Sequence, residues 1–525
     1  MWWLWLVLTS TVSILSAVIY WWYRVRYAFA DKWPTMESTY PLVGNGPVMM
    51  GKSDTERFEI IKQTYASTDR IRKAWAGPKL LLLVTHPDLV QQLLTDPICL
   101  EKPFLYRFAG FEQGLFTAKY HTWKTMRKRL NPCFNIKIIH GFIPILARCG
   151  IKMGRRLNEF PDGTVVNIHK FTALCTLEMA CGTTLGRNVL DRDQKRKLEF
   201  EHGLDTAFRI ASHRMITIQY YSDFVFRLSK LHKELQDARK AVVDFFLDLV
   251  NERRQSLQKP KLIDSNNNIE TNNNTKHVNN NLEDSGEDLV RKPKILVDQL
   301  LMGSSDGTPF SDQEITDNIY AVISGAVDTS GLITAHACLF LSFYPEVQKR
   351  LFAEINEHYP ADCTDPDFSP ETLKQLEYTE MFLNEVQRLW TVVPYVAREN
   401  TAEIEIDGIK VPPGNVFVMS LFAVHRRTDI WGPNAEQFDP ENFSKERMRD
   451  RHPFAFLPFS GGNRICVGWR YAQFALKIIM INLVRNFEFN SKIKPEDIRF
   501  LHDLTLKLPF EHAVKLTKRN PAAWS

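Results

Sequence analysis

The chain has 525 residues, a net charge of +5 and 44% hydrophobic residues. The composition is that of a globular protein with one large domain or several ordinary ones, which excludes global disorder. The charge is mild and no basic stripe with interleaved aromatic residues occurs, so we expect no nucleic-acid partner. The eight cysteines lack the paired spacing of zinc sites and disulfide frameworks, which favours a reducing compartment.

Residues 1–23 predict a transmembrane helix. They are almost wholly apolar, and tryptophan and tyrosine gather near both ends. About 20 apolar residues span a bilayer as a helix, and the basic residues Arg24, Arg26 and Lys32 that follow mark its cytosolic side. A cleaved signal peptide is the alternative, but its basic residues would precede the apolar run. Residues 24–50 then predict a basic linker rich in proline and glycine.

Short helix and strand patterns open the remaining region, 51–525, which we expect to form one domain. Residues 58–64 and 88–94 predict helices, and the apolar run 80–85 predicts a buried strand. Trp123 and Arg127 lie four residues apart and share one face of the next predicted helix. The alternative interpretation of that helix is an exposed basic surface.

The middle of the chain predicts several amphipathic helices, from about residue 140 to 255. Residues 262–292 then change sharply in composition, with repeated asparagines and few large apolar side chains. Such a segment buries too little apolar surface to order itself, so we predict a flexible surface insertion.

A long apolar helix is predicted from Ser311 to about residue 343. Ser311 followed by Glu314 forms a capping box at its start. Near its middle, small residues precede Asp328 and Thr329, so a flat group could approach the helix beside an acid and a hydroxyl that pass protons. The alternative is a buried helix that tolerates Gly325, with the Thr329 hydroxyl bonded to a carbonyl one turn earlier.

Further helical and strand patterns lie beyond residue 380. Glu385 and Arg388 are spaced to pair across one helical turn, although an exposed pair of this kind contributes little stability. Residues 404–411 alternate around Asp-Gly and predict a hairpin. Residues 504–508 alternate in the same way and predict a strand. Short strands beside many long helices indicate a mainly α fold of the α+β kind.

The most specific motif, F-x-x-G-x-R-x-C-x-G, comprises Phe459, Gly462, Arg464, Cys466 and Gly468. A predicted helix begins just after Cys466, and a thiolate is favoured near the positive end of a helix. The glycines allow close backbone approach and amides directed at sulfur. An ordinary buried cysteine in a glycine-rich loop is the alternative.

Together these motifs resemble the cytochrome P-450 superfamily over nearly the whole chain, and within it the microsomal fatty-acid ω-hydroxylases (family 4-like). The resemblance implies the P-450 fold, with a long central helix and small β-sheets. It implies haem b with Cys466 as the axial thiolate. It also implies that Phe459 shields the thiolate and that the propionates are held by four residues: Trp123, Arg127, Arg398 and Arg464.

The resemblance assigns further roles. Asp328 and Thr329 deliver protons, and Glu385 and Arg388 brace the fold together with Asn442, which replaces an arginine usual in the superfamily. Many ω-hydroxylases carry a glutamate where this chain has Gly325. We therefore expect no covalent link between the protein and its haem, and a roomier pocket.

The implied activity is that of a monooxygenase in the endoplasmic reticulum membrane, with its catalytic domain in the cytosol. It would insert one atom of O2 into a lipophilic substrate, a fatty acid or similar molecule. NADPH-cytochrome reductase would supply the electrons, with a cytochrome b-type protein as a further candidate donor. The alternatives are a monooxygenase of terpenoids or foreign compounds, a haem-thiolate isomerase or dehydratase, and a non-enzymatic haem sensor.

Overall fold

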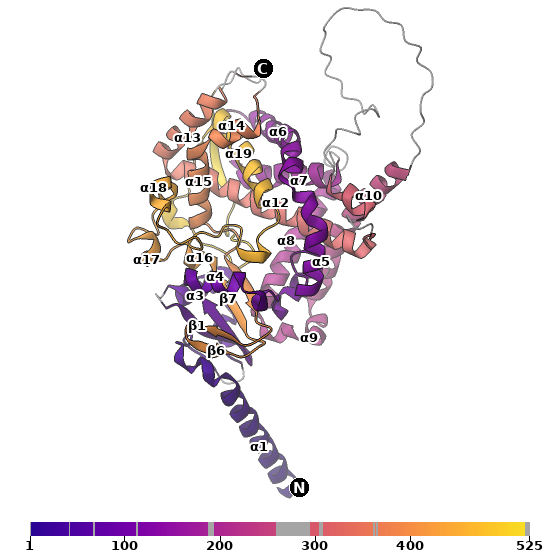
Figure 1. The fold of residues 1–525 in the computed structure, drawn as a ribbon, viewed down its shortest axis with the longest axis vertical. Coiled ribbons are helices and arrows are strands. Elements are labelled where there is room, and N and C mark those ends of the chain that lie inside the picture. The colour runs from indigo at the N-terminus through magenta and orange to yellow at the C-terminus, as the bar shows by residue number, and fades with distance from the viewer. Residues whose placement is uncertain are drawn as a thin grey trace, which may run out of the picture.

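A large helical body carries a smaller β-sheet region at the end nearest the N-terminal helix α1 (Figure 1). The computed structural model describes residues 2–40, 43–66, 69–111, 114–186, 194–258, 295–303, 308–360, 363 and 366–519. The predicted insertion at 262–292 lies outside these residues.

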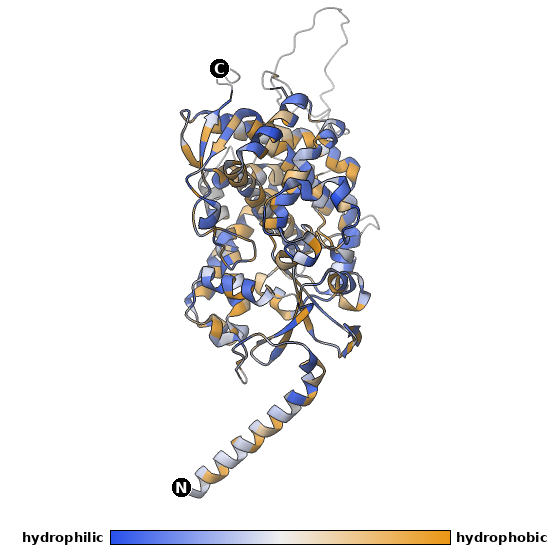
Figure 2. Cartoon of the chain, turned by 90° about the vertical axis from the view of Figure 1, so that its left-hand side faces the viewer, coloured by the Kyte–Doolittle hydropathy of each residue, from blue (hydrophilic) through white to orange (hydrophobic). Residues whose placement is uncertain are grey.

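Helix α1 (Trp2–Tyr27) projects away from the body, and hydrophobic or neutral colours cover most of its length (Figure 2). By length and composition, two helices in the described part of the chain could cross a membrane, or three if the bent pair α5–α6 counts as one. They are the helix at Trp5–Lys32 and the helix at Asp312–Phe343, whose most apolar windows are 0% and 72% buried in the protein. The N-terminal apolar helix was predicted, and it leaves its apolar surface uncovered.

The segment predicted as a linker packs against the sheet region. It contains η1 (Ala28–Lys32) and α2 (Gly46–Met49). The backbone N–H of Met36 donates to the Lys73 carbonyl at 2.8 Å, and Asn45 N–H donates to the Trp75 carbonyl at 2.8 Å. These bonds attach Met36 and Asn45 to strand β1 (Ile71–Ala76).

Helix α12 (Asp312–Phe343) runs through the middle of the body (Figure 1). Ser311 caps it as predicted: its hydroxyl accepts the Glu314 N–H, and Glu314 Oε2 accepts the Ser311 N–H at 2.8 Å. Most of its surface is apolar, and a helix apolar on all sides is stable only when others surround it. Its neighbours include α7 (Ile168–Leu185) and α19 (Trp469–Asn486).

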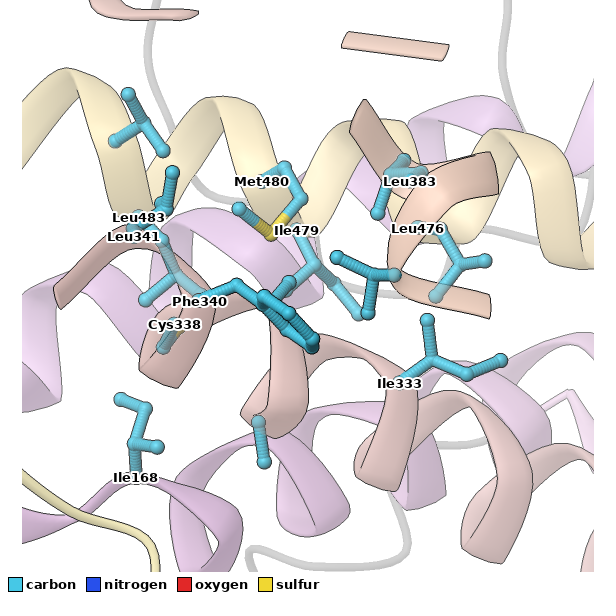
Figure 3. Packing of buried hydrophobic residues seen from close by; sticks show 14 of the residues in the cluster. Ile168, Ile333, Cys338, Phe340, Leu341, Leu383, Leu476, Ile479, Met480 and Leu483 are labelled. Atoms are coloured by element: carbon cyan, nitrogen blue, oxygen red, sulfur yellow. The ribbon is translucent and has the colours of Figure 1, made fainter. Parts of the chain in front are cut away.

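The main hydrophobic core lies where α12, α19 and α15 (Glu377–Leu389) meet (Figure 3). Phe340 of α12 and Leu476 and Met480 of α19 are among its buried members. Each such side chain contributes about 1.5–3 kcal/mol when it is fully buried. This packing fixes α19, and therefore the loop that precedes it, relative to α12.

Helices and 3₁₀ turns cover this core and link it to the sheet region. Those not yet named are α3 (Asp54–Tyr65), α4 (Pro87–Thr95), η2 (Pro97–Cys99), η3 (Phe104–Ala109), α5 (Tyr120–Leu130), η4 (Asn131–Phe134), α6 (Ile136–Asn158), α8 (Gln194–Ile216), η6 (Ile218–Tyr221), α9 (Asp223–Arg227), α10 (Lys230–Gln258), α11 (Leu296–Met302), α13 (Pro345–His358), α14 (Pro370–Gln375), α16 (Leu421–Val424), α17 (Thr428–Trp431), η8 (Pro440–Phe443), α18 (Lys445–Met448), η9 (Gly462–Arg464) and η10 (Pro495–Asp497). The helices predicted at 58–64 and 88–94 are the central parts of α3 and α4.

The largest sheet has the order β1-β2-β7-β4 and includes β2 (Lys79–Val84), β7 (Val416–Ser420) and β4 (Tyr395–Glu399). The β2–β7 pair is parallel, and the two outer pairs are antiparallel. Strand β2 is the run predicted at 80–85. A second sheet has the order β3-β9-β8, formed by β3 (Val165–Asn167), β9 (Ala513–Lys518) and β8 (Phe487–Asn490).

The hairpin predicted at 404–411 is confirmed as β5 (Ile404–Ile406) and β6 (Ile409–Val411). Its turn residues Asp407 and Gly408 have φ angles of 53° and 74°, as a tight two-residue turn requires.

The strand predicted at 504–508 is wrong. The chain bends at 503–505, and only an isolated bridge joins Leu501 to Lys507 among the described residues. The alternation arises because Leu506 packs into the core while its N–H donates to the Val392 carbonyl at 2.7 Å. Leu506 and Leu508 therefore pack into the core without a neighbouring strand among the described residues.

Candidate active site

The loop from Phe459 to Gly468 presents Cys466 just before the first turn of α19. The Cys466 N–H donates to the Phe459 carbonyl at 3.0 Å, which closes the loop. Gly468 is the N-cap of α19, and its backbone N–H is directed at the Cys466 thiol. The predicted arrangement of a sulfur near a helix N-terminus is present, and a thiolate is stabilised there.

Opposing effects act on the pKa of the Cys466 thiol. Burial raises this pKa, whereas the Gly468 N–H and the nearby Arg127 guanidinium lower it. The side chain nevertheless retains accessible surface. Protein therefore surrounds the sulfur without covering it, which leaves room for a bonding partner.

Gly462 is needed where the loop meets the end of α4. Its φ is +65°, and a Cβ at this position would lie 1.9 Å from the Leu94 carbonyl oxygen. At Gly468, by contrast, no described atom lies within 4 Å of the corresponding position. The two motif glycines thus differ: Gly462 permits close packing against Leu94, whereas Gly468 contributes its N–H.

Gly462→Ala should destabilise the fold by at least about 2 kcal/mol, because left-handed backbone costs about 1–2 kcal/mol and the methyl group overlaps the Leu94 carbonyl. Chemical unfolding of the purified protein measures the change. Gly468→Ala is the matched control, with an expected loss below about 0.5 kcal/mol. Equal losses in the two variants would contradict the assignment.

Three cations lie together beside this loop: the buried Arg398 and Arg464 and the half-buried Lys102. Burial lowers the pKa of each, to about 10 for Arg464, and Arg398 lowers the pKa values of Lys102 and Arg464 further. The Nε atoms of both arginines and Nη2 of Arg464 have no hydrogen-bond partner among the described residues. Buried like charges with unsatisfied N–H groups are costly unless an anion joins them. The two carboxylates of a haem fit this requirement.

Lys102 was missed by the sequence analysis. It follows Glu101 and precedes Pro103 without any motif, and its position beside Arg398 arises only in the folded chain. Its Nζ lies 3.9 Å from the centre of the Tyr106 ring.

The pair Trp123 and Arg127 on α5 comes to the same place. The Arg464 guanidinium lies 4.5 Å from the centre of the Trp123 ring, and its Nη1 donates to the Ala118 carbonyl at 3.0 Å. Arg127 is close enough to Cys466 to lower the pKa of its thiol. The alternative of a wholly exposed basic helix therefore fails for Trp123, which is buried.

The middle of α12 contributes Gly325, Asp328 and Thr329. The Thr329 hydroxyl donates to the Gly325 carbonyl at 2.7 Å, the back-bond considered above. Both residues line a cavity, and no described atom lies within 4 Å of the Cβ position of Gly325. Asp328 Oδ2 is buried without a hydrogen-bond partner among the described residues. The helix thus offers an acid, a hydroxyl and open space in consecutive turns.

Asp328 also belongs to a charge cluster around Lys507, in which Asp205 is exposed and the other side chains are largely buried. The Lys507 Nζ lies 2.6 Å from Asp205 Oδ1, 3.1 Å from Asp503 Oδ2 and 3.9 Å from Asp328 Oδ1. Burial opposes a charge on Lys507, but the three carboxylates raise its pKa above the usual value. Burial raises the pKa of Asp503 as well. The bend that replaces the predicted strand delivers Lys507 to this cluster.

Lys507→Met should destabilise the protein by roughly 2–3 kcal/mol at pH 8, because it leaves buried carboxylates without their cation. In the folded protein the pKa of Asp503 already lies above its ordinary value, and loss of the lysine should raise it further. At pH 8 the charged carboxylate is therefore less stable in the folded state than in the unfolded state. As the pH falls to 5, Asp503 takes up a proton in the folded variant, and we expect the loss to shrink by about half. Unfolding curves at both pH values measure this.

Lys515→Met replaces an exposed lysine and serves as the control. It should change stability little at either pH. A loss in Lys507→Met that is independent of pH would show that the charges are unimportant.

The cavity beside α12 has a volume of about 390 Å³. Its walls come from α3, the largest sheet, α8, α12 and the 502–505 segment, and from Met36, Asn45 and Gly46 of the segment that follows α1. Most of these side chains are apolar. The cavity therefore suits a lipophilic molecule, with Thr329 on its wall.

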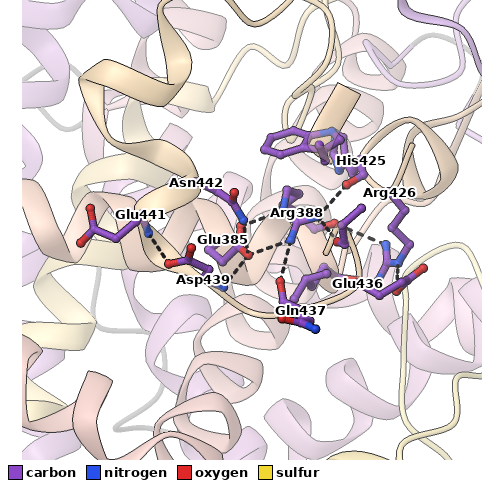
Figure 4. Close-up of polar contacts among 12 residues, drawn as sticks. Glu385, Arg388, His425, Arg426, Glu436, Gln437, Asp439, Glu441 and Asn442 are labelled. Carbon is purple, nitrogen blue, oxygen red and sulfur yellow. Dashed lines mark hydrogen bonds and ion pairs between the residues drawn. The ribbon is translucent and has the colours of Figure 1, made fainter. Parts of the chain in front are cut away.

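The predicted pairing of Glu385 with Arg388 is confirmed, and the pair is fully buried rather than exposed (Figure 4). The Arg388 Nε and Nη2 atoms donate to the two Glu385 oxygens, each at 2.7 Å. Arg388 also donates to three backbone carbonyls in the segment before the Cys466 loop, those of His425, Ala435 and Gln437.

Asn442 completes this network. Its Nδ2 donates to Glu385 Oε1 at 3.1 Å, and its backbone carbonyl accepts a hydrogen bond from Arg451 Nη1 at 2.7 Å. Glu385 also acts electrostatically on Arg451. A second arginine charge is therefore present near the pair, although position 442 does not supply it.

Comparison with known proteins gives a consistent result. The family described as cytochrome P450 matches residues 34–513. The chain is 27% identical to probable cytochrome P450 313a4 of Drosophila melanogaster over 91% of this chain and 92% of the relative. It is 26% identical to cytochrome P450 4c21 of Blattella germanica, over 94% and 95%, and 27% identical to human cytochrome P450 4V2, over 94% and 92%.

Proposed function

The chain belongs to the cytochrome P450 family of monooxygenases, and from this membership we propose that Cys466 binds the haem iron and that a lipophilic substrate occupies the cavity beside Thr329. The observation that carries the proposal is the group of buried cations next to an accessible thiol. Arg398 and Arg464 hold unsatisfied N–H groups in a region where Arg127 and the Gly468 N–H favour a thiolate.

In this proposal Trp123, Arg127, Arg398 and Arg464 hold the haem propionates, and Lys102 joins them. Phe459 shields the thiolate, and Gly462 and Gly468 shape the loop that positions it. When bound, haem b supplies the oxygen-activating chemistry that lets one atom of O2 enter the substrate. The buried Glu385–Arg388 pair and Asn442 hold the segment leading to the Cys466 loop in place.

Asp328 and Thr329 act on protons. The Asp328 Oδ2 atom is buried without a hydrogen-bond partner among the described residues, and Lys507 Nζ lies 3.9 Å from Oδ1. Its neighbour Thr329 presents a hydroxyl to the cavity. An acid next to a hydroxyl can pass a proton inward while the apolar walls exclude bulk water. An isomerase or a haem sensor has no need of this pair, so its presence favours the monooxygenase.

The protein would be anchored in the endoplasmic reticulum membrane by α1, with its catalytic domain in the cytosol. The uncovered apolar surface of α1 and the basic residues Arg24 and Arg26 at its end support this. Electrons would come from NADPH-cytochrome reductase, with a cytochrome b-type protein as a second donor. The exposed Lys124 and Lys128 on α5 offer such acidic partners a docking surface near Arg127.

Reconstitution with a reductase and NADPH tests the proposal. A panel of fatty acids, fatty alcohols, terpenoids and foreign lipophilic compounds would be incubated, and products one oxygen heavier sought by mass spectrometry. A carbon monoxide difference spectrum reports the thiolate-bound haem independently of substrate. Absence of the red-shifted Soret band would overturn the haem assignment. A normal band without any NADPH-dependent product would instead favour a sensor or an isomerase.

A further inference from the structure

We propose that the cavity selects neutral lipophilic molecules that carry a hydroxyl or carbonyl group, and that it discriminates against fatty-acid carboxylates. This inference rests on the proposed function and names its substrate class. It is carried by the charges around the cavity and by two polar atoms on its wall.

Among the described residues, the cavity wall offers a substrate carboxylate no cation other than the one proposed to bind the haem propionates. Among the described residues that line it, Lys102 and Asp503 are the only ones with a charged side chain. Lys102 belongs to the group with Arg398 and Arg464, which the haem propionates would occupy. His502 also lines the cavity, but burial lowers its pKa to about 4, so its ring is neutral at physiological pH.

The wall formed by residues 502–505 is instead negative. Asp503 lines the cavity, and Asp328 and Asp205 lie behind it around the Lys507 ammonium. Three carboxylates face one cation there. Burial holds the neighbouring His169 imidazole in its neutral form by lowering its pKa. Arg209 faces Asp205 from within α8, but it pairs with Glu234 on the protein surface. A substrate anion near this wall is repelled.

Two residues that line the cavity carry buried hydroxyl groups without a partner among the described residues. Neither Tyr320 Oη nor Thr505 Oγ1 has a hydrogen-bond partner in the described part of the protein, and the two residues are only 6% and 4% exposed. Both line the cavity. Buried hydroxyls are costly when unsatisfied, and a ligand hydroxyl or carbonyl can satisfy each of them. A plain hydrocarbon cannot.

Arg239 is the cation that a carboxylate could otherwise reach. It acts on Tyr320 electrostatically, lowering its pKa against the larger effect of burial, but it does not line this cavity. The Phe111 ring stacks on the Tyr320 ring with 3.6 Å between their centres, and Arg239 lies 5.9 Å from the Phe111 ring. Its Nη2 donates to the Phe108 carbonyl. Arg239 therefore lies against Phe111 and next to Gly110 at the edge of the cavity, without lining it.

The test compares ligands with one carbon skeleton and different head groups. Dodecanoic acid, methyl dodecanoate, dodecan-1-ol and dodecane would be titrated into the full-length holoprotein at pH 7.5. Dissociation constants would come from the spectral shift on binding and from ligand-induced thermal stabilisation. We expect the alcohol and the ester to bind about tenfold more tightly than the acid.

The variants Tyr320→Phe and Thr505→Val identify the polar contacts. Each substitution should weaken the binding of dodecan-1-ol about three- to tenfold and change the dissociation constant of dodecane by less than about twofold. If the variants weakened the binding of dodecan-1-ol and of dodecane equally, both residues would contribute only packing, and their role as hydrogen-bond partners would be overturned. Binding of the acid as tight as that of the alcohol would overturn the inference, most directly if Arg239→Met then weakened the acid alone.

This outcome is separable from failure of the proposed function. Oxidation of the acid in preference to the neutral ligands would support the monooxygenase activity and overturn only the proposed preference for neutral substrates. A missing carbon monoxide band would remove the monooxygenase itself.

Discussion

Cys466→Ala should eliminate haem retention and all NADPH-dependent oxidation. In the wild-type protein the thiol receives the Gly468 N–H and lies near Arg127, an environment arranged for a negative sulfur. Alanine removes the ligand atom and leaves these groups without an anion. Changing a group that merely supports a metal ligand costs about 10- to 100-fold in affinity, so loss of the ligand should exceed about 100-fold. Haem absorbance per purified protein and the carbon monoxide difference spectrum measure the result.

Cys363→Ala is the matched control. Cys363 is a partly accessible thiol remote from α19 in sequence, and its backbone carbonyl, which accepts a bond from Arg485, is kept in the variant. Haem content and oxidation should therefore stay at wild-type values. If Cys466→Ala retained haem with an unchanged thiolate spectrum, another cysteine would have to be the ligand.

Arg388→Met should remove a large part of the folding stability and lower the yield of folded protein. The substitution leaves the Glu385 carboxylate fully buried, with the Asp439 N–H and the Asn442 amide as its remaining donors among the described residues. It also strips the carbonyls of His425, Ala435 and Gln437 of their shared donor. Breaking a buried pair costs about 3–5 kcal/mol, and whole domains are stable by only about 5–15 kcal/mol. The yield of folded protein and the unfolding midpoint report the loss.

A second substitution separates buried charge from lost volume. Glu385→Gln added to Arg388→Met removes the uncompensated carboxylate and should recover part of the loss. Lys445→Met breaks the exposed Lys445–Glu377 pair, whose side chains are 85% and 65% accessible, and should cost less than about 1 kcal/mol. A double variant no more stable than Arg388→Met would show that the lost carbonyl contacts dominate.

Local features of the fold could be predicted because neighbouring residues determine them. The Ser311–Glu314 capping box, the Asp407–Gly408 turn and the helix after Cys466 each depend on a few adjacent side chains, and each is present. The strand at 504–508 failed for the converse reason. Its alternating pattern reflects contacts with Val392 and the core, which are distant in sequence.

The site shows the same division. Motif spacing identified Trp123, Arg127 and Cys466, and the structure brings Arg127 near that sulfur. Lys102 and Lys507 carried no signal, because the roles of both depend on charges that are distant in sequence: Arg398 and Arg464 for Lys102, and Asp205 and Asp328 for Lys507. Asn442 stands where an arginine is usual in the superfamily, so position 442 supplies no charge to the Glu385–Arg388 pair. Arg451, nine residues further on, lies close enough for Glu385 to act on it.

The segment after α1 both lines the cavity and bonds to the largest sheet, and this bears on how the protein diverges from its relatives. Met36, Asn45 and Gly46 form part of the cavity wall, and Met36 and Asn45 are bonded to β1. The residues that lead from helix α1 into the domain therefore also shape the cavity proposed for the substrate. Mutations in this short stretch can alter substrate preference during evolution while every haem-binding motif stays unchanged. Paralogues that differ mainly between residues 36 and 49 would then be expected to act on different substrates.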